Sequence, residues 1–137
     1  MKRVFLDANT LVSGIVFSGP EHELLKHGIR KQFELVTSED VIGEIVEVIN
    51  RKFPEKAFLV KEFLKLAEIK TIQRKYYEKL VEKQKVRDAK DRHVLAAAIA
   101  AKCDFLVTGD KDLLVLKKHG RLAIQTTKGI LAGSRAI

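Results

Sequence analysis

The chain has 137 residues, 46% of them hydrophobic and 32% charged, which is typical of one folded globular domain and excludes a disordered chain. Its 26 Lys and Arg against 18 Asp and Glu give a net charge of +8, which favours a polyanionic partner such as nucleic acid. Short apolar runs exclude a bilayer span, one cysteine (Cys103) excludes an internal disulfide, and the early Asp7 argues against a secretory signal, so we expect a cytoplasmic protein.

The first half of the chain predicts two strands, over 4–6 and 33–36, because both are short apolar runs. Helices are expected after Pro20, over 38–50, where a serine cap precedes acids, and after Pro54. The apolar residues expected to face the core from these helices are Leu24, Leu25, Ile29, Val41, Ile42, Ile45, Val48, Ile49, Phe58, Leu59, Phe63 and Leu66.

The second half predicts strands over 69–72, 105–107 and 122–125 and a charged surface helix over 76–85. The helix expected over 90–102 is apolar on every side in its stretch VLAAAIAA, which predicts a buried helix. Another helix, over 110–119, is expected to end at Gly120. Alternating strands and helices predict a three-layer α/β/α sandwich with a central parallel sheet, formed by a single domain over residues 1–137.

Two of the predicted strands end at an acid: VFLD ends at Asp7 and FLVTGD ends at Asp110. In a parallel sheet the carboxyl ends of the strands share one edge, and ligands bind there. If the two strands are neighbours, Asp7 and Asp110 face one crevice. Asp112 follows two residues later, and either Asp110 or Asp112 can also serve simply as the cap of the next helix.

Other acids add to this edge, and each has a structural alternative. On the helix over 38–50, Glu44 lies at the border of the apolar stripe, where a glutamate is also common for structural reasons, whereas Glu47 points away. Asp88 and Asp91 begin the buried helix, where the first suits an N-cap and the second complements the helix dipole. Taken singly, each acid is explained by structure as well as by function.

Taken together, the acids are more informative. Two carboxylates about 5 Å apart repel by about 3 kcal/mol at an effective dielectric constant near 20, so four at one edge require protonation or a bound cation. Oxygen ligands without His or Cys suit Mg²⁺ or Mn²⁺ rather than zinc. Paired ions of this kind hydrolyse phosphodiesters. An acidic metal site on a basic protein therefore predicts a nuclease.

The segments VFLDANTLVSG, SEDVIGEI, DAKDRHVLAAAIA and FLVTGDKDLL, in this order, resemble the four motif regions of the PIN domain family. The resemblance spans roughly residues 2–125 and is strongest to compact prokaryotic toxins of the VapC type. It implies an α/β/α fold and a Mg²⁺- or Mn²⁺-dependent endoribonuclease that is the toxin of a toxin–antitoxin pair. The implied partners are RNA, a cognate antitoxin protein and a second copy of the chain.

The resemblance also implies roles for individual residues. The four family acids, which hold the metal and carry catalysis, fall on Asp7, Glu44, Asp91 and Asp110, and Asp112 matches a further metal-binding acid. The positions that support these acids are Asn9, Asp88 and Thr108. The basic residues that flank the acids and can contact RNA phosphates, or be ordinary solvated charges, are Arg87, Lys90 and Arg92. Toxins often carry an aromatic residue where Leu113 stands here.

Two rival functions follow from the same residues. A phosphatase of the haloacid-dehalogenase type uses the Asp after the first strand as nucleophile, but its D-x-D motif is broken here by Asn9. A catalytically silent PIN scaffold that binds RNA or protein has no reason to keep the repulsion among the acids. No histidine is needed for the hydrolysis, so His93 and His119 are expected to be structural, the latter in the last turn of a helix.

Overall fold

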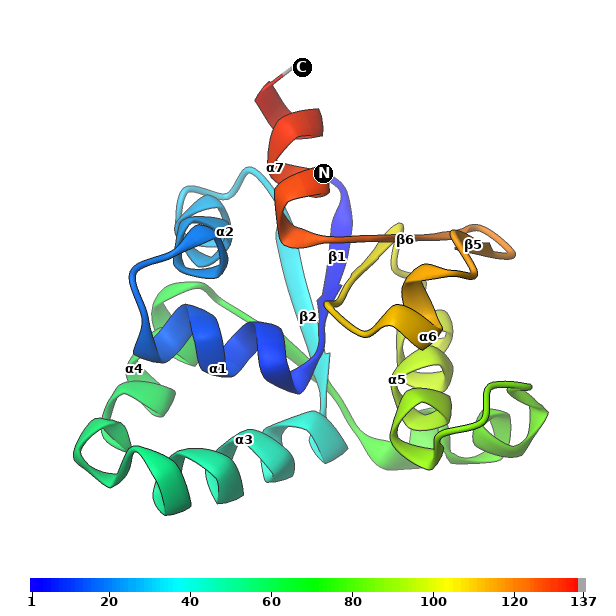
Figure 1. The fold of residues 1–137 in the computed structure, drawn as a ribbon, viewed down its shortest axis with the longest axis horizontal. Helices are drawn as coiled ribbons and strands as arrows, with labels where there is room; N and C mark the ends of the chain where they lie inside the picture. Colours follow the sequence, from blue (N-terminus) through cyan, green and yellow to red (C-terminus); the bar gives the residue numbers. More distant parts are fainter. Residues whose placement is uncertain (136–137) are drawn as a thin grey trace.

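The computed structural model describes residues 1–135 and contains a six-stranded sheet with helices on both faces (Figure 1). The strand order is β3-β2-β1-β4-β6-β5, and neighbouring strands are parallel except β5 and β6. The strands are β1 (Arg3–Leu6), β2 (Glu34–Ser38), β3 (Lys70–Ile72), β4 (Phe105–Val107), β5 (Lys118–His119) and β6 (Leu122–Gln125). The predicted three-layer α/β/α architecture is confirmed, with β5 as an antiparallel addition at one edge.

The helices form the outer layers. In Figure 1, α1, α2 and α4 lie to the left of β1, and α5 and α6 lie to the right, while α3 contacts α1. The α-helices are α1 (Ala8–Val16), α2 (Pro20–Ile29), α3 (Glu39–Lys52), α4 (Leu59–Leu66), α5 (Ala89–Ala100), α6 (Lys111–Leu114) and α7 (Thr127–Arg135). The 3₁₀ helices are η1 (Pro54–Lys56), η2 (Arg74–Tyr76) and η3 (Glu78–Lys83). Among the helices described, none is both long and apolar enough to cross a membrane.

The central strand β1 determines where the functional edge of the sheet lies. Its residue Phe5 pairs with Val36 of β2 on one side and with Leu106 of β4 on the other, and all three side chains are buried. The chain leaves β1 towards β2 but later returns to place β4 on the opposite side of β1. Such a switch point opens a crevice outside the carboxyl ends of the strands, where ligands bind in open α/β sheets.

Helix α5 is buried, as the sequence predicts. The side chains from Leu95 to Ala98 are fully shielded from solvent, and the small alanines let the helix lie close to β2. Asp88 caps the helix by accepting a hydrogen bond from the backbone N–H of Lys90 at 2.8 Å. The buried apolar part of α5 therefore fixes the position of Asp91, which lies one turn before Val94.

Several predicted elements differ in the structure. The chain forms α1 and α7, which the apolar patterns do not reveal, and segment 74–83 forms two 3₁₀ helices instead of an α-helix over 76–85. The helix predicted over 110–119 ends at Leu114, because the chain turns into a hairpin with positive φ at Lys117 (59°) and Gly120 (63°). The predicted position of His119 in a last helical turn is therefore wrong, since this residue lies in β5.

Some residues that were predicted to face the core are exposed: Ile29, Phe58 and Leu66. Phe58 is 70% exposed because α4 begins only at the next residue. The side of α4 that packs on the core carries Val60 and Leu64, followed by Ala67, at the spacing of one helical face. That choice of face leaves Leu66 57% exposed.

Candidate metal centre

Asp7 lies immediately after β1 and is held by two donors. One carboxylate oxygen accepts a hydrogen bond from the backbone N–H of Thr10 at 2.9 Å, which caps α1, and the other accepts from the hydroxyl of Thr108 at 2.5 Å. The Thr108 hydroxyl oxygen in turn accepts from the backbone N–H of Asp110 at 3.0 Å. Thr108, where the resemblance expects a supporting hydroxyl, thus connects the acid after β1 to the acid after β4.

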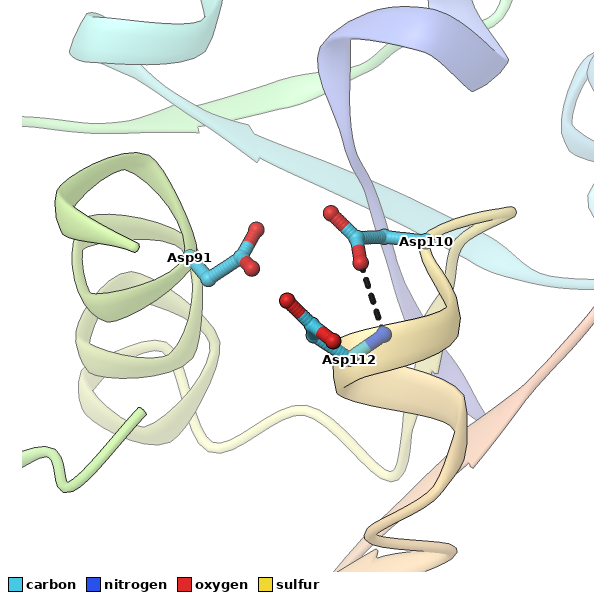
Figure 2. A group of neighbouring side chains, drawn as sticks. All are labelled: Asp91, Asp110 and Asp112. Carbon is cyan, nitrogen blue, oxygen red and sulfur yellow. Dashed lines mark hydrogen bonds between the residues drawn. The ribbon is translucent and has the colours of Figure 1, made fainter. Parts of the chain in front are cut away.

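Asp110 also belongs to a group of three neighbouring carboxylates near the first turns of α5 and α6. One oxygen from each of Asp91, Asp110 and Asp112 lies within 4.8 Å of the others, between the first turns of α5 and α6 (Figure 2). Asp110 also caps α6, because its Oδ1 accepts from the backbone N–H of Asp112 at 2.8 Å. The structural and functional interpretations of Asp110 are therefore compatible: one of its oxygens caps the helix while the carboxylate as a whole faces other acids.

A cavity of about 230 Å³ at this edge, here called the acid cavity, brings the remaining predicted residues together. Its polar lining residues are Asp7, Asn9, Glu44, Glu47, Arg51, Asp88, Lys90, Asp91 and Asp110. All four predicted family acids thus line one space, together with the predicted supporting residues Asn9 and Asp88. Glu47, expected from the helix geometry to point away, is an addition, and it pairs with Arg51 at 3.1 Å on the cavity wall.

Burial dominates the electrostatics of the acid cavity. Burial raises the pKa of the Asp7 carboxyl, against the lowering effect of its hydrogen bonds from Thr108 and Thr10. Burial, followed by the negative charges of Asp110 and Asp88, raises the pKa of Asp91 to about 6. The raised pKa of Asp91 therefore reflects burial first and the neighbouring carboxylates second.

The surroundings of the Asp91 carboxylate indicate which kind of ligand suits the site. The residue is only 7% exposed, and its Oδ2 is buried without a hydrogen-bond partner in the described part of the chain. A buried carboxylate oxygen without a donor or counter-ion costs several kcal/mol, on the order of 2–5 kcal/mol. A cation is the partner that satisfies this oxygen and the neighbouring carboxylates at once.

The donor set fits a hard divalent cation. Carboxylate oxygens are the ligands that Mg²⁺ and Mn²⁺ prefer, whereas zinc sites use His or Cys, and neither lines the acid cavity. The candidates to hold such an ion are the four predicted family acids, which line the cavity, and Asp112, which has a carboxylate oxygen within 4.8 Å of oxygens of Asp91 and Asp110.

Two of the predicted phosphate-binding cations are paired with these acids. The Nζ of Lys90 lies 2.7 Å from Oε1 of Glu44, and this contact raises the pKa of Lys90. An Nη2 atom of Arg87 lies 3.2 Å from Oδ2 of Asp112. Both basic side chains are strongly exposed, at 79% and 89%, so both are free to leave the acids for a ligand.

Arg92 is placed differently from the other two. Its Nη1 donates to the backbone carbonyls of Val86 at 2.9 Å and of Arg87 at 2.8 Å. The side chain therefore fastens the segment that leads into α5, and the geometry gives no support to its predicted contact with phosphate.

The structure thus defines an α/β protein with an acid-lined cavity at the switch point of a parallel sheet. The family model described as PIN domain matches residues 3–112, which is well over half of the sequence. The chain belongs to the PIN domain family, as the resemblance of its motifs predicts.

Solved structures show the same fold. The crystal structure of VapBC2 from Rickettsia felis, bound to a DNA fragment from its promoter, matches with a TM-score of 0.67 and 18% identity, over 90% of this chain and 98% of that chain. Mycobacterium tuberculosis VapC20, described as a toxin that cleaves the sarcin–ricin loop, matches with a TM-score of 0.54 and 15% identity, over 82% and 94%. A comparison with curated protein sequences finds no significant match. None of these matches supports the alternative of a haloacid-dehalogenase-like phosphatase.

Proposed function

We propose that this PIN protein is a Mg²⁺- or Mn²⁺-dependent endoribonuclease that acts as the toxin of a toxin–antitoxin pair. The observation that carries the proposal is Oδ2 of Asp91, which is buried and has no hydrogen-bond partner among the described residues. It belongs to a cavity lined by acids from α3, α5 and the ends of β1 and β4. The net charge of +8 suits a polyanionic substrate. The two structural neighbours, one a toxin–antitoxin complex and one a toxin that cleaves RNA, support the same assignment.

In this mechanism one or two ions would be held by Asp7, Glu44, Asp91 and Asp110, with Asp112 as a further ligand. Divalent ions bound there supply an activated water and neutralise the charge that develops on the phosphate.

The protein itself positions the ligands and neutralises the substrate. Thr10 and Thr108 fix both oxygens of Asp7, so this ligand is oriented before the substrate arrives. Lys90 and Arg87 balance the acids of the resting site and then turn to the phosphates of the RNA, whose affinity they raise without reading its sequence.

The proposal includes a cognate antitoxin protein, a homodimer and a cytoplasmic location. Support for an antitoxin comes from the Rickettsia felis complex, in which the matching chain is crystallised as VapBC2.

The test is incubation of the purified chain with structured and unstructured RNA in Mg²⁺, in Mn²⁺ and in chelator, followed by mapping of the ends. We expect cleavage within the RNA that depends on the ion and disappears with the chelator. RNA binding without cleavage in either ion would instead identify a catalytically silent scaffold. A phosphorylated Asp7, trapped with a phosphate ester, would identify a phosphatase.

A further inference from the structure

A second cavity, also of about 230 Å³, adjoins the acid cavity. The two cavities share the lining residues Glu44, Lys90 and Val94. The ion pair between Lys90 and Glu44 therefore forms part of the wall between them. We call this space the Arg74 cavity, and its other lining residues are Ser38, Asp40, Val41, Arg74 and His93.

Two cationic side chains and a histidine face the Arg74 cavity. Arg74 comes from η2, and Lys90 and His93 lie one turn apart on α5, so the two positive charges come from separate parts of the chain. Arg74 and Lys90 are half or more exposed, which leaves their donors accessible from solvent. A guanidinium has five N–H donors. Arg74 Nη1 lies 3.4 Å from Oδ1 of Asp40 and Nε lies 3.9 Å from Oε1 of Glu78, so these two contacts leave the donors of Nη2 available to a ligand.

Asp40, one of the two acids that line the Arg74 cavity, already has several partners. Its Oδ2 accepts the hydroxyl of Tyr77 at 2.6 Å and lies 3.2 Å from Nδ1 of His93. Because this carboxylate is shared among Arg74, His93 and Tyr77, it does not occupy all the donors of Arg74. The other acid, Glu44, is the partner of Lys90, and an ion bound to Glu44 would leave the charge of Lys90 available to the cavity.

The floor of the Arg74 cavity is rigid. Tyr77 is fully buried, and the backbone N–H of Asp40 donates back to its hydroxyl at 3.3 Å. The backbone N–H of Arg74 donates to Oε1 of Glu39 at 3.1 Å, which fastens η2 to the first turn of α3. Binding energy gained there is therefore not spent on ordering the loop that carries Arg74.

We infer that the Arg74 cavity binds a phosphodiester group of the RNA. This group is next to the cleaved phosphodiester on the same strand, and Arg74 and Lys90 contact it. This inference rests on the proposed function, and it identifies the subsite that holds the substrate in register. Consecutive phosphates of a single strand belong in adjoining cavities, and the shared wall makes the two cavities adjoin. Contacts to phosphate position a nucleic acid and are independent of its sequence.

The first experiment measures binding without cleavage. The Kd of a short, fluorescently labelled single-stranded RNA is determined in chelator at several salt concentrations for the wild type, Arg74→Gln, Arg74→Lys and Arg30→Gln. Arg30→Gln is the matched control, because Arg30 is 58% exposed, pairs with Glu23 at 3.6 Å and lies just after α2, outside the residues that line either cavity.

Arg74→Gln is expected to raise Kd about three- to tenfold over the control and to reduce the slope of log K against log salt by about 0.7, the value of one lost phosphate contact on a single strand. Arg74→Lys is expected to keep most of the slope. Equal Kd values and slopes for Arg74→Gln and Arg30→Gln would overturn the inference.

The second experiment uses the cleavage site mapped in the RNA. A neutral methylphosphonate is placed at the phosphate on either side of that site, and KM and kcat are measured for the wild type and Arg74→Gln. At one of the two positions, the neutral group is expected to raise KM for the wild type and to have no further effect on Arg74→Gln. Additive losses in the variant at both positions would overturn the inference. If the wild type cleaves no RNA, the proposed function fails, and the binding measurement alone decides the cavity.

Discussion

The two ends of β4 carry an aspartate each, and the surroundings of these two acids are opposite. Asp104, before the strand, accepts the backbone N–H of Arg3 at 2.8 Å and lines a cavity of about 500 Å³ together with basic residues such as Lys102 and Arg121. Asp110, after the strand, lies beside Asp91 and Asp112 and lines the much smaller acid cavity. The acid of the larger space thus has a hydrogen-bond donor, whereas the smaller space contains Asp91, whose Oδ2 has no hydrogen-bond partner among the described residues.

This contrast indicates that uncompensated negative charge, rather than cavity volume, distinguishes the candidate site from the opposite end of the sheet. At the amino end, the carboxylate has a donor and cations nearby, and burial raises the pKa of the Cys103 thiol to about 12, so the thiol is not a nucleophile at neutral pH. At the carboxyl end, the fold carries repulsion and an oxygen without a partner. A fold of ordinary stability tolerates this unfavourable free energy where a bound ligand relieves it.

The largest expected effect separates these two aspartates directly. Asp110→Asn is expected to lower metal-dependent cleavage of RNA at least about a hundredfold, because it removes a charged ligand from the metal site. Asp104→Asn keeps an oxygen that accepts from Arg3 and is expected to leave the rate unchanged. Initial rates of RNA cleavage in Mg²⁺ measure both effects. Equal losses of rate in the two variants would contradict the distinction between Asp110 and Asp104.

A second prediction concerns the stability of the metal-free protein. The pKa of Asp91 in the folded state, about 6, exceeds the ordinary value of 3.8, so the folded state holds this proton more tightly than the unfolded state does. The resulting stability is complete below pH about 4 and is lost as the pH rises through about 6. At pH 7 in chelator, the free energy of unfolding of Asp91→Asn is therefore expected to exceed that of the wild type by about 1–2 kcal/mol.

Urea unfolding at pH 4.5 and pH 7 in chelator measures this difference. The advantage of Asp91→Asn is expected to shrink at the lower pH and to shrink also when Mg²⁺ stabilises the wild type. An advantage that is the same at both pH values would show that charge is not its cause.

A third prediction separates Arg92, which binds backbone carbonyls, from Arg87 and Lys90, which pair with acids. Arg92→Gln is expected to destabilise the fold by about 1 kcal/mol, because the carbonyls of Val86 and Arg87 lose their donor. Its affinity for RNA is expected to match that of the wild type. Thermal unfolding and fluorescence anisotropy test the two parts, and weakened RNA binding without loss of stability would restore the predicted phosphate contact.

The smallest expected effect concerns the competition between Lys90 and a metal ion for Glu44. Lys90→Gln removes a positive charge 2.7 Å from a ligand oxygen, so the affinity for Mn²⁺ is expected to rise about threefold. Isothermal titration calorimetry measures this change, with Lys31→Gln, which removes the partner of the remote Glu68, as the control. Lower affinity in Lys90→Gln than in this control would mean that the lysine supports the metal site.

The sequence was sufficient for the parts of the fold that depend on buried apolar patterns. The runs VFL and FLV predict two strands, and the structure places them side by side as β1 and β4, so that Asp7 and Asp110 meet at one edge. The stretch VLAAAIAA predicts a helix that is buried all round, and α5 is such a helix.

Other features depend on tertiary contacts that local patterns do not contain. The exposed faces of α4 follow from where that helix begins, and the hairpin after Leu114 follows from positive φ values at Lys117 and Gly120. The Arg74 cavity requires Tyr77 to hold Asp40 across 37 residues of sequence, a pairing that no spacing rule predicts. The sequence predicted Arg87 and Lys90 beside the acids, whereas the ion pairs that they form with Asp112 and Glu44 are apparent only in three dimensions.

The most direct test of the metal site is the position of Mn²⁺ in crystals of the protein, located by its anomalous scattering. We expect a peak in the acid cavity, within about 2.2 Å of carboxylate oxygens from Asp7, Asp91 and Asp110. A protein that binds Mn²⁺ only elsewhere, for example beside Asp104 at the opposite end of β4, or that leaves these three carboxylates without any ion at saturating Mn²⁺, would contradict it.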